Sequence, residues 1–286
     1  MAFQIVKGKQ DAPKLLCIYG PDGTGKTRLA ASAPAPLFID LEKGSLELDV
    51  DRVSDVNSLD DLVKLLTELA GADAGPYKTL IIDSLTKIES WMMAVVKDPG
   101  YGRWGSEMAP HWRKIMTLLD QIRAKGINVI VIAHAMATKF NDPTQQIDYD
   151  KIGLRLEKVV AAMIREWVSG VYYLTREIKV VKGKDSSRGK AFDTGDRRLL
   201  YTVGRPAFDA KSRYNVPSEI EIPLNNGYQT IFKSNVDVNK ELAELVKLIK
   251  SDEMRAKAQT AIDDATIDRT AILKRIKDII DSEVPA

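Results

Sequence analysis

Short apolar runs alternate with longer segments of helical periodicity along the first two thirds of the chain. Apolar residues at helical spacing mark residues 58–69, where Ser58 is a candidate N-cap, and residues 115–126, which end at Gly126. Continuous apolar strands separated by helices are typical of a parallel sheet that is covered on both faces. The pattern therefore predicts an α/β fold with five core strands, at residues 15–19, 37–40, 79–83, 128–133 and 171–174.

The pattern changes after Arg176. Shorter apolar runs follow without helices between them, and they predict an antiparallel extension of the sheet at residues 178–181, 198–203 and 219–222. Residues 183–195 are polar and contain glycine, which predicts a loop. Helical spacing returns after residue 239. We therefore predict a core domain at residues 1–235 and a small helical appendage at residues 236–286.

Composition narrows the class of protein. The chain has 286 residues, 44% of them hydrophobic, as in ordinary globular proteins. Its single cysteine, Cys17, excludes a disulfide framework, so we expect the cytoplasm as its compartment. No apolar run is long enough to cross a bilayer and no signal-peptide core is present, so we expect no membrane partner.

Charge is balanced overall and uneven along the chain. The net charge is +2, but residues 176–213 hold eleven Lys and Arg against five Asp and Glu. Such an excess fits a surface that binds a polyanion, with residues 176–198 as an electrostatic track for DNA, and it equally fits a solvated face.

Residues 20–27 carry the most specific motif, because they read G-x-x-x-x-G-K-T between a predicted strand and a predicted helix. Glycines let backbone N–H groups wrap an anion, Lys26 would reach the terminal phosphates, and the Thr27 hydroxyl would bind Mg²⁺. We therefore predict a phosphate-binding loop. Its nucleotide-binding residues are Gly20, Pro21, Asp22, Gly23, Thr24, Gly25, Lys26, Thr27 and Arg28.

Two acidic positions fit this loop. Asp83 ends an apolar strand and is a candidate Mg²⁺ ligand, although an acid at a strand end is often only a cap. Glu42 follows the second strand and is a candidate general base that orients the attacking water. Asp40 is the alternative base, and a surface turn in which Glu42 pairs with Lys43 is the structural alternative.

The order of these motifs resembles the RecA core. Phe38-Ile39-Asp40-Leu41-Glu42 and Ile81-Ile82-Asp83-Ser84 follow the phosphate loop in the RecA order. GTPases carry an Asn-Lys-x-Asp motif that this chain lacks, and AAA+ proteins usually carry Glu where this chain has Ser84. Residues 131–139, with His134 and a later Thr-Lys pair, look like the strand end of RadA/Sms proteins. The resemblance implies ATP with Mg²⁺, and His134 as a sensor of the γ-phosphate.

A second resemblance concerns assembly. Residues 209–214 are similar to the Lys-x-Arg segment of RadA and DnaB-type helicases, in which both basic residues reach the neighbouring subunit's nucleotide. That role for Lys211 and Arg213 implies a ring or filament of copies of this chain, whereas a basic surface is the plain alternative.

Residues 14–224 resemble most the phage-borne Sak single-strand-annealing proteins. This resemblance implies that the chain binds single-stranded DNA, takes part in recombination and works in the host cytoplasm. A single-strand-binding protein is a further candidate partner.

The same resemblance places DNA at two loops, residues 97–112 with their flank and residues 138–152. Their basic and aromatic residues suit single strands, because bases stack on rings and phosphates meet cations. Alternatively, Trp104 and Trp112 pack beneath the first loop. The candidate DNA contacts are Arg103, Trp104, Arg113, Lys139 and Lys151.

Three functions fit these motifs. The first is a DNA-dependent ATPase that promotes annealing or strand exchange. The second is a hexameric motor or loader of helicase type. The third is an assembly factor that is gated by ATP without hydrolysing it.

Overall fold

The computed structural model describes most of the chain. The described residues are 7–8, 12–73, 75–96, 100, 102–142, 147–182, 189–232, 242, 244–249, 251–263, 272, 275–276 and 279–280. The chain divides into two compact units, Met1–Tyr228 and Gln229–Ala286.

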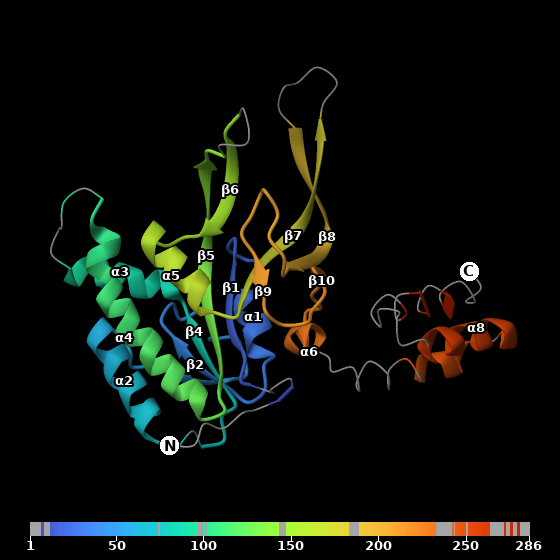
Figure 1. The fold of residues 1–286 in the computed structure, drawn as a ribbon, viewed down its shortest axis with the longest axis horizontal. Helices are drawn as coiled ribbons and strands as arrows, with labels where there is room; N and C mark the ends of the chain where they lie inside the picture. The colour runs from blue at the N-terminus through green and yellow to red at the C-terminus, as the bar shows by residue number, and fades with distance from the viewer. Residues whose placement is uncertain are drawn as a thin grey trace. The chain divides into compact units, whose positions relative to one another are not determined.

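The described elements follow the predicted alternation of strands and helices (Figure 1). In chain order they are β1 (Leu15–Gly20), α1 (Lys26–Ala31), β2 (Pro36–Asp40), β3 (Asp51–Val53), α2 (Leu59–Gly71), β4 (Thr79–Asp83), α3 (Leu85–Val95), α4 (Trp104–Ala124), β5 (Asn128–Phe140), β6 (Tyr149–Leu154), α5 (Lys158–Trp167), β7 (Gly170–Lys182), β8 (Gly189–Tyr201), β9 (Lys211–Ser212), β10 (Glu219–Glu221), α6 (Gly227–Ile231) and α8 (Asp252–Asp263).

One mixed sheet organises the larger unit. Its strand order is β10-β8-β7-β1-β5-β4-β2-β3, with β6 paired to β5 and β9 paired to β7. The strands from β7 to β3 pair in parallel along this path, whereas β8 and β10 extend the sheet by antiparallel pairing. The predicted fold class, a mostly parallel sheet with an antiparallel extension, is confirmed.

Helices cover both faces of the sheet. Leu15, Cys17 and Tyr19 of β1 share one apolar core with α2, α3, α4 and α5, which lie together on one side in Figure 1. Leu16 and Ile18 point to the opposite face, because side chains alternate along a strand, and they are fully buried there. The buried Leu29 and Ala30 of α1 lie outside the first core and next to β1 and β5. This burial on both faces explains the continuous apolar runs.

The parallel register brings the carboxyl ends of four strands to one edge. Gly20 of β1 pairs with His134 of β5, and Asp40 of β2 pairs with Asp83 of β4. Strand β5 lies between β1 and β4, so His134 stands between the phosphate loop and Asp83. Residues far apart in the sequence thus meet at this edge.

Two segments differ from the sequence predictions. The predicted strand at 171–174 and the shorter one at 178–181 form a single strand, β7, with an irregularity in its pairing between Arg176 and Ile178. The loop predicted at 183–195 is wrong for residues 189–195, which belong to β8, and residues 183–188 lie outside the described residues. A polar composition therefore does not exclude strand structure in this segment.

The smaller unit is helical where it is described. Leu242, Val246, Ile249, Ala258, Ile272 and Ile276 form its apolar cluster. Among the described residues of the whole chain, none of the helices has the length and hydropathy that a membrane crossing requires.

Candidate functional site

Glycines shape the loop between β1 and α1. Gly25 adopts a φ of 88°, a left-handed conformation that L side chains rarely take. A Cβ at Gly20 would collide with the backbone carbonyl oxygen of Leu174 on β7. The loop therefore needs glycine at both positions, one for its turn and one for its close approach to the sheet.

Lys26 and Thr27 begin α1 beneath this loop. The buried Lys26 donates from Nζ to the carbonyl oxygens of Gly20 and Pro21, at 3.0 and 2.9 Å, and burial lowers the pKa of its ammonium. The Thr27 Oγ1 hydroxyl donates to Oδ2 of Asp83 at 2.7 Å. Burial raises the pKa of Asp83 to about 6, and the hydrogen bond from Thr27 opposes that shift. A hydroxyl and a carboxylate thus meet beside a buried cation.

Asp40, the alternative candidate base, makes hydrogen bonds within its own turn. Its carboxylate accepts N–H groups from Gly44 and Ser45, at 3.1 and 2.9 Å, and the Ser45 hydroxyl at 2.6 Å. It holds the turn that follows β2, so its oxygens are occupied by that turn, and Glu42 lies within the same turn.

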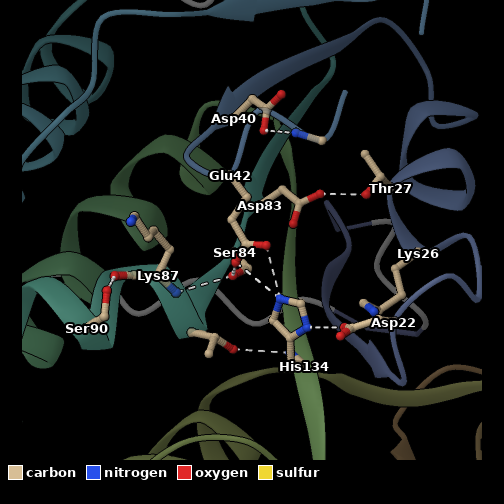
Figure 2. A network of polar contacts seen from close by, with 12 residues as sticks. Asp22, Lys26, Thr27, Asp40, Glu42, Asp83, Ser84, Lys87, Ser90 and His134 are labelled. Carbon is tan, nitrogen blue, oxygen red and sulfur yellow. Dashed lines mark hydrogen bonds and ion pairs between the residues drawn. The ribbon is translucent and has the colours of Figure 1, made fainter. Parts of the chain in front are cut away.

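Glu42 is held from two sides (Figure 2). Ser84 Oγ, directly after the metal-ligand candidate Asp83, donates to Glu42 Oε1. The ring of His134 lies between Glu42 and Asp22, with Nε2 at 3.1 Å from Glu42 Oε2 and Nδ1 at 2.6 Å from Asp22 Oδ1. The contact with His134 lowers the pKa of Asp22. Glu42 does not pair with Lys43 in these contacts, and a histidine joins the phosphate loop to the candidate base.

A cavity opens on the other side of the loop. It measures about 420 Å³ and is lined by residues 23–28 together with Arg176, Arg198 and Leu224. Arg176 of β7 and Arg198 of β8 come from the antiparallel extension. Lys26 and Thr27 line this cavity and also reach the acidic side, so the loop lies between a basic wall and an acidic one.

These residues fit a nucleoside triphosphate with Mg²⁺. The cavity presents cations and backbone N–H groups, which suit phosphate, and the oxygens of Thr27 and Asp83 are the ligand type that Mg²⁺ prefers. When bound, the metal would neutralise charge that develops on the transferred phosphoryl group.

A family model described as an AAA domain matches residues 12–214, which is most of the chain. The chain belongs to this AAA domain family. The match begins just before β1 and ends after the Lys-x-Arg segment, so it covers the phosphate loop and both of its walls. The coarser part of the sequence prediction, a P-loop nucleotide-binding domain, is confirmed.

Two individual proteins are also similar to parts of this chain. A "SPbeta prophage-derived uncharacterized protein YorG" of Bacillus subtilis (strain 168) is 29% identical over 140 residues, which are 44% of this chain and 42% of that protein. The chain thus spans less than half the length of that relative. A solved structure, "Crystal structure of the RadB recombinase", has 15% identity and a TM-score of 0.44, with 76% of this chain and 90% of that one covered.

Lys211 and Arg213 lie away from their own chain's phosphate loop. Lys211 pairs with Val171 in the first half of β7, whereas the loop stands at the carboxyl end of β1. The two side chains reach the carbonyl oxygen of Glu166, at 3.5 and 3.3 Å. They do not join their own chain's site, so the proposed trans role stays a prediction.

The first predicted DNA loop is wrong over residues 104–112, which are helical, and the alternative of a packed side chain is confirmed for Trp112. Residues 104–112 form the first turns of α4, Trp112 is fully buried in the core, and Trp104 packs against that core. The fully buried Trp112 ring is not available for stacking, whereas Trp104 is only partly buried against the core. Arg103 and Arg113 are exposed, whereas residues 97–99 and 101 lie outside the described residues.

The second predicted loop is a β-hairpin over much of its length. Strands β5 and β6 pair from Ala135–Leu154 to Phe140–Tyr149, and residues 143–146 lie outside the described part. Lys139 is exposed near the tip. Lys151 is at 2.8 Å from Asp209 and lies over the Phe140 ring, so its ammonium already has an acidic partner.

Sequence reasoning missed the nucleotide-side position of Arg176 and Arg198, and the contact of Ser84 with Glu42. Ser84 follows Asp83 directly, and that adjacency was a usable signal. For Arg198 the sequence offers none, because it stands next to Arg197 in a run of basic residues.

Proposed function

We propose that this chain is a Mg²⁺-dependent ATPase that binds single-stranded DNA and promotes recombination, by annealing or strand exchange, as an oligomer. The observation that carries the proposal is the contact of Thr27 with Asp83 at 2.7 Å, beside Lys26 and Glu42. At one edge of the sheet, these residues place a cation for phosphate, two oxygen ligands for Mg²⁺ and a carboxylate that can orient water.

The residues divide the hydrolysis between them. Lys26 binds the terminal phosphates of ATP, and Glu42 orients water and accepts its proton as the water oxygen attacks the γ-phosphorus. The bond from that phosphorus to the oxygen bridging the β- and γ-phosphates breaks, and ADP leaves with that oxygen. His134 and Ser84 hold the carboxylate of Glu42 in place. The two ring nitrogens of His134 contact Asp22 of the phosphate loop and Glu42, so the ring links the loop that binds the γ-phosphate to the base.

The β5–β6 hairpin is the proposed DNA contact. It starts directly after His134, and its tip carries Lys139, Phe140 and Tyr149, with the two rings 5.5 Å apart. Figure 1 shows this hairpin projecting beyond the sheet. Base stacking on such rings and phosphate contact with lysine support single-strand binding.

Assembly rests on Lys211 and Arg213. Because both side chains contact the carbonyl oxygen of Glu166 rather than their own phosphate loop, the proposed catalytic role is assigned to a neighbouring copy's site. The sequence resemblance to RadA/Sms and Sak proteins supports recombination, and similarity to a prophage-derived protein supports a phage origin.

The decisive experiment measures ATP turnover with and without an unstructured oligonucleotide. We expect turnover to rise at least severalfold with the oligonucleotide, and DNA affinity to fall with added salt. Absence of both stimulation and salt-sensitive binding rules the proposal out. Directional unwinding of a forked duplex supports a motor instead.

The hairpin is tested by the double variant Phe140→Ala/Tyr149→Ala. We expect roughly tenfold weaker oligonucleotide binding and unchanged affinity for ATP. Lys64→Ala on the exposed surface of α2 is the control, and it should bind DNA as the unmodified chain does.

Shared sites are tested by mixing Lys211→Ala with Lys26→Ala chains. Partial recovery of hydrolysis is expected, since each chain supplies what the other lacks. Mixtures that stay inactive contradict the trans role.

A further inference from the structure

Two arginines of the antiparallel extension lie against the phosphate loop. Arg176 on β7 and Arg198 on β8 are register partners. Arg176 Nη2 donates to the carbonyl oxygen of Gly23 at 3.2 Å. A Cβ at Gly25 would lie 2.5 Å from Nη1 of Arg198, so the missing side chain of Gly25 admits the guanidinium.

Their placement concentrates positive charge in one cavity. Register partners on adjacent strands have Cβ atoms about 5 Å apart, and Lys26 lines the same space of about 420 Å³. Arg198 is 6% exposed, so its charge is largely removed from water. Three cations that line one cavity attract an anion with several charges.

Arg197 shows that the placement is selective. It neighbours Arg198 on β8, but its side chain is 51% exposed and ion-pairs with Glu177 at 3.0 Å and Glu221 at 2.9 Å. Successive side chains of a strand point to opposite faces. The adjacent arginines thus differ in their contacts. Arg197 forms ion pairs with the neighbouring strands on the exposed face, and Arg198 faces the phosphate loop.

We propose that Arg176 and Arg198 bind the phosphate groups of the nucleotide in cis, from the side of the loop opposite Asp83 and Glu42. The proposal rests on the proposed function, because it takes a nucleoside triphosphate as the ligand of this cavity. It also assigns these two residues to the nucleotide rather than to a DNA track. A bound nucleotide would thereby contact both strands of the β7–β8 hairpin, through Arg176 on β7 and Arg198 on β8.

The test measures binding rather than turnover. Two probes are used with the full chain, tripolyphosphate alone and a non-hydrolysed ATP analogue with Mg²⁺, and dissociation constants are obtained by calorimetry. Arg198→Gln should weaken both probes roughly 30-fold and Arg176→Gln roughly tenfold, as expected for lost charge-assisted hydrogen bonds. Arg197→Gln removes the same charge from the opposite face, and its dissociation constants for both probes should stay within about twofold of those of the unmodified chain.

Folding is controlled separately. Circular dichroism and the unfolding temperature are compared for all variants, because Arg198 is buried. If Arg198→Gln does not fold, the proposal is tested by the probe affinities of Arg176→Gln, because Arg176 is exposed. Arg176→Lys is expected to recover part of the affinity that Arg176→Gln loses.

Each outcome separates the two proposals. Unchanged affinity in both variants, or an equal loss in Arg197→Gln, overturns this inference while leaving a nucleotide-binding chain. A loss of DNA affinity alone also overturns it. If the unmodified chain binds neither probe, the proposed function falls as well. If binding depends on both arginines but DNA does not stimulate hydrolysis, only the proposed function falls.

The cis assignment has its own test. At an ATP concentration well below the weakened dissociation constant of Arg198→Gln, mixing Arg198→Gln with Lys26→Ala chains should give no more hydrolysis than Arg198→Gln alone, because neither chain then holds a complete set of its own residues. Recovery would assign Arg198 to a neighbouring copy's nucleotide and overturn the cis role.

Discussion

The two walls of the phosphate loop are built in different ways. The acidic wall, Asp22, Glu42 and Asp83 with His134, comes from the loop itself and from the carboxyl ends of parallel strands. The basic wall, Arg176 and Arg198, comes from an antiparallel pair at the other side of β1. Parallel strands bring their carboxyl ends to one edge by construction, so short motifs suffice to build the first wall. The second depends on how far the antiparallel strands extend and which face each side chain takes.

Charge links the two walls. The acidic wall suits a cation and the basic wall suits an anion, and a nucleoside triphosphate with Mg²⁺ supplies both at once. Lys26 and Thr27 belong to both sides, since they line the cavity and contact groups at the acidic edge or in the loop. Mutations on the acidic side should therefore affect chemistry, whereas mutations on the basic side should affect binding.

Glu42→Gln gives the largest expected effect. It keeps the size of the side chain and removes the base, so turnover should fall about 1,000-fold while the dissociation constant for ATP stays within about twofold. Steady-state kinetics and calorimetry measure the two quantities. Glu47→Gln, in the exposed turn that follows, is the matched control. Normal turnover in Glu42→Gln would remove the acidic wall's catalytic role and favour an ATP-gated assembly factor.

Asp83→Asn should have the next largest effect. The amide loses the negative charge that suits Mg²⁺, so turnover should fall about 100-fold and the Mg²⁺ concentration for half-maximal rate should rise. A chelator should abolish turnover of the unmodified chain. Asp60→Asn in the exposed first turn of α2 is the control, and an unchanged Mg²⁺ requirement in Asp83→Asn would contradict the metal role.

His134→Asn should have a smaller effect, about tenfold on turnover with KM unchanged, because the variant loses one of two hydrogen bonds that position Glu42. The measurement is the pH profile of turnover together with its DNA stimulation. The chain's other histidine, exposed His111 on α4, provides His111→Asn as the control. Equal effects of both variants would argue against a positioning role.

Glu89→Gln should leave turnover unchanged and alter stability. Burial raises the pKa of Glu89 on α3 from 4.5 to about 7, and its carboxylate accepts the N–H of Glu157 at 2.8 Å. Between these pH values the folded chain binds the proton and the unfolded chain releases it, so the free energy of unfolding falls as pH rises through this window. The glutamine variant should lack this slope and be about 2 kcal/mol more stable above pH 7, after allowance for solvent near the carboxyl.

Urea unfolding at pH 5 and pH 8 measures this effect. Equal pH dependence in both proteins would show that Glu89 is ionised throughout. A loss of turnover in Glu89→Gln would show that an acidic residue of α3 also contributes to hydrolysis. Unchanged turnover would restrict the catalytic acidic residues to those of the acidic wall.

The sequence predicted the parallel core well because each strand is a continuous apolar run, and such runs need both faces buried. It predicted the phosphate loop because the motif is local and its glycines are required by backbone geometry, as at Gly25. It failed at the hairpins, where polar composition was taken as loop, and it left two alternatives open at Trp112. An aromatic side chain can stack on a base or fill a core, and only the packing of α4 decides between them.

The sequence by itself thus predicted the loop, the neighbourhood of Asp83 and Glu42, and a phosphate-bearing ligand, because these predictions follow from local geometry and from strand ends. Only the tertiary structure decided that Arg198 faces the loop while Arg197 faces solvent. The reason is that a run of basic residues carries no information about strand register. A shift of one residue would exchange the two side chains between the faces.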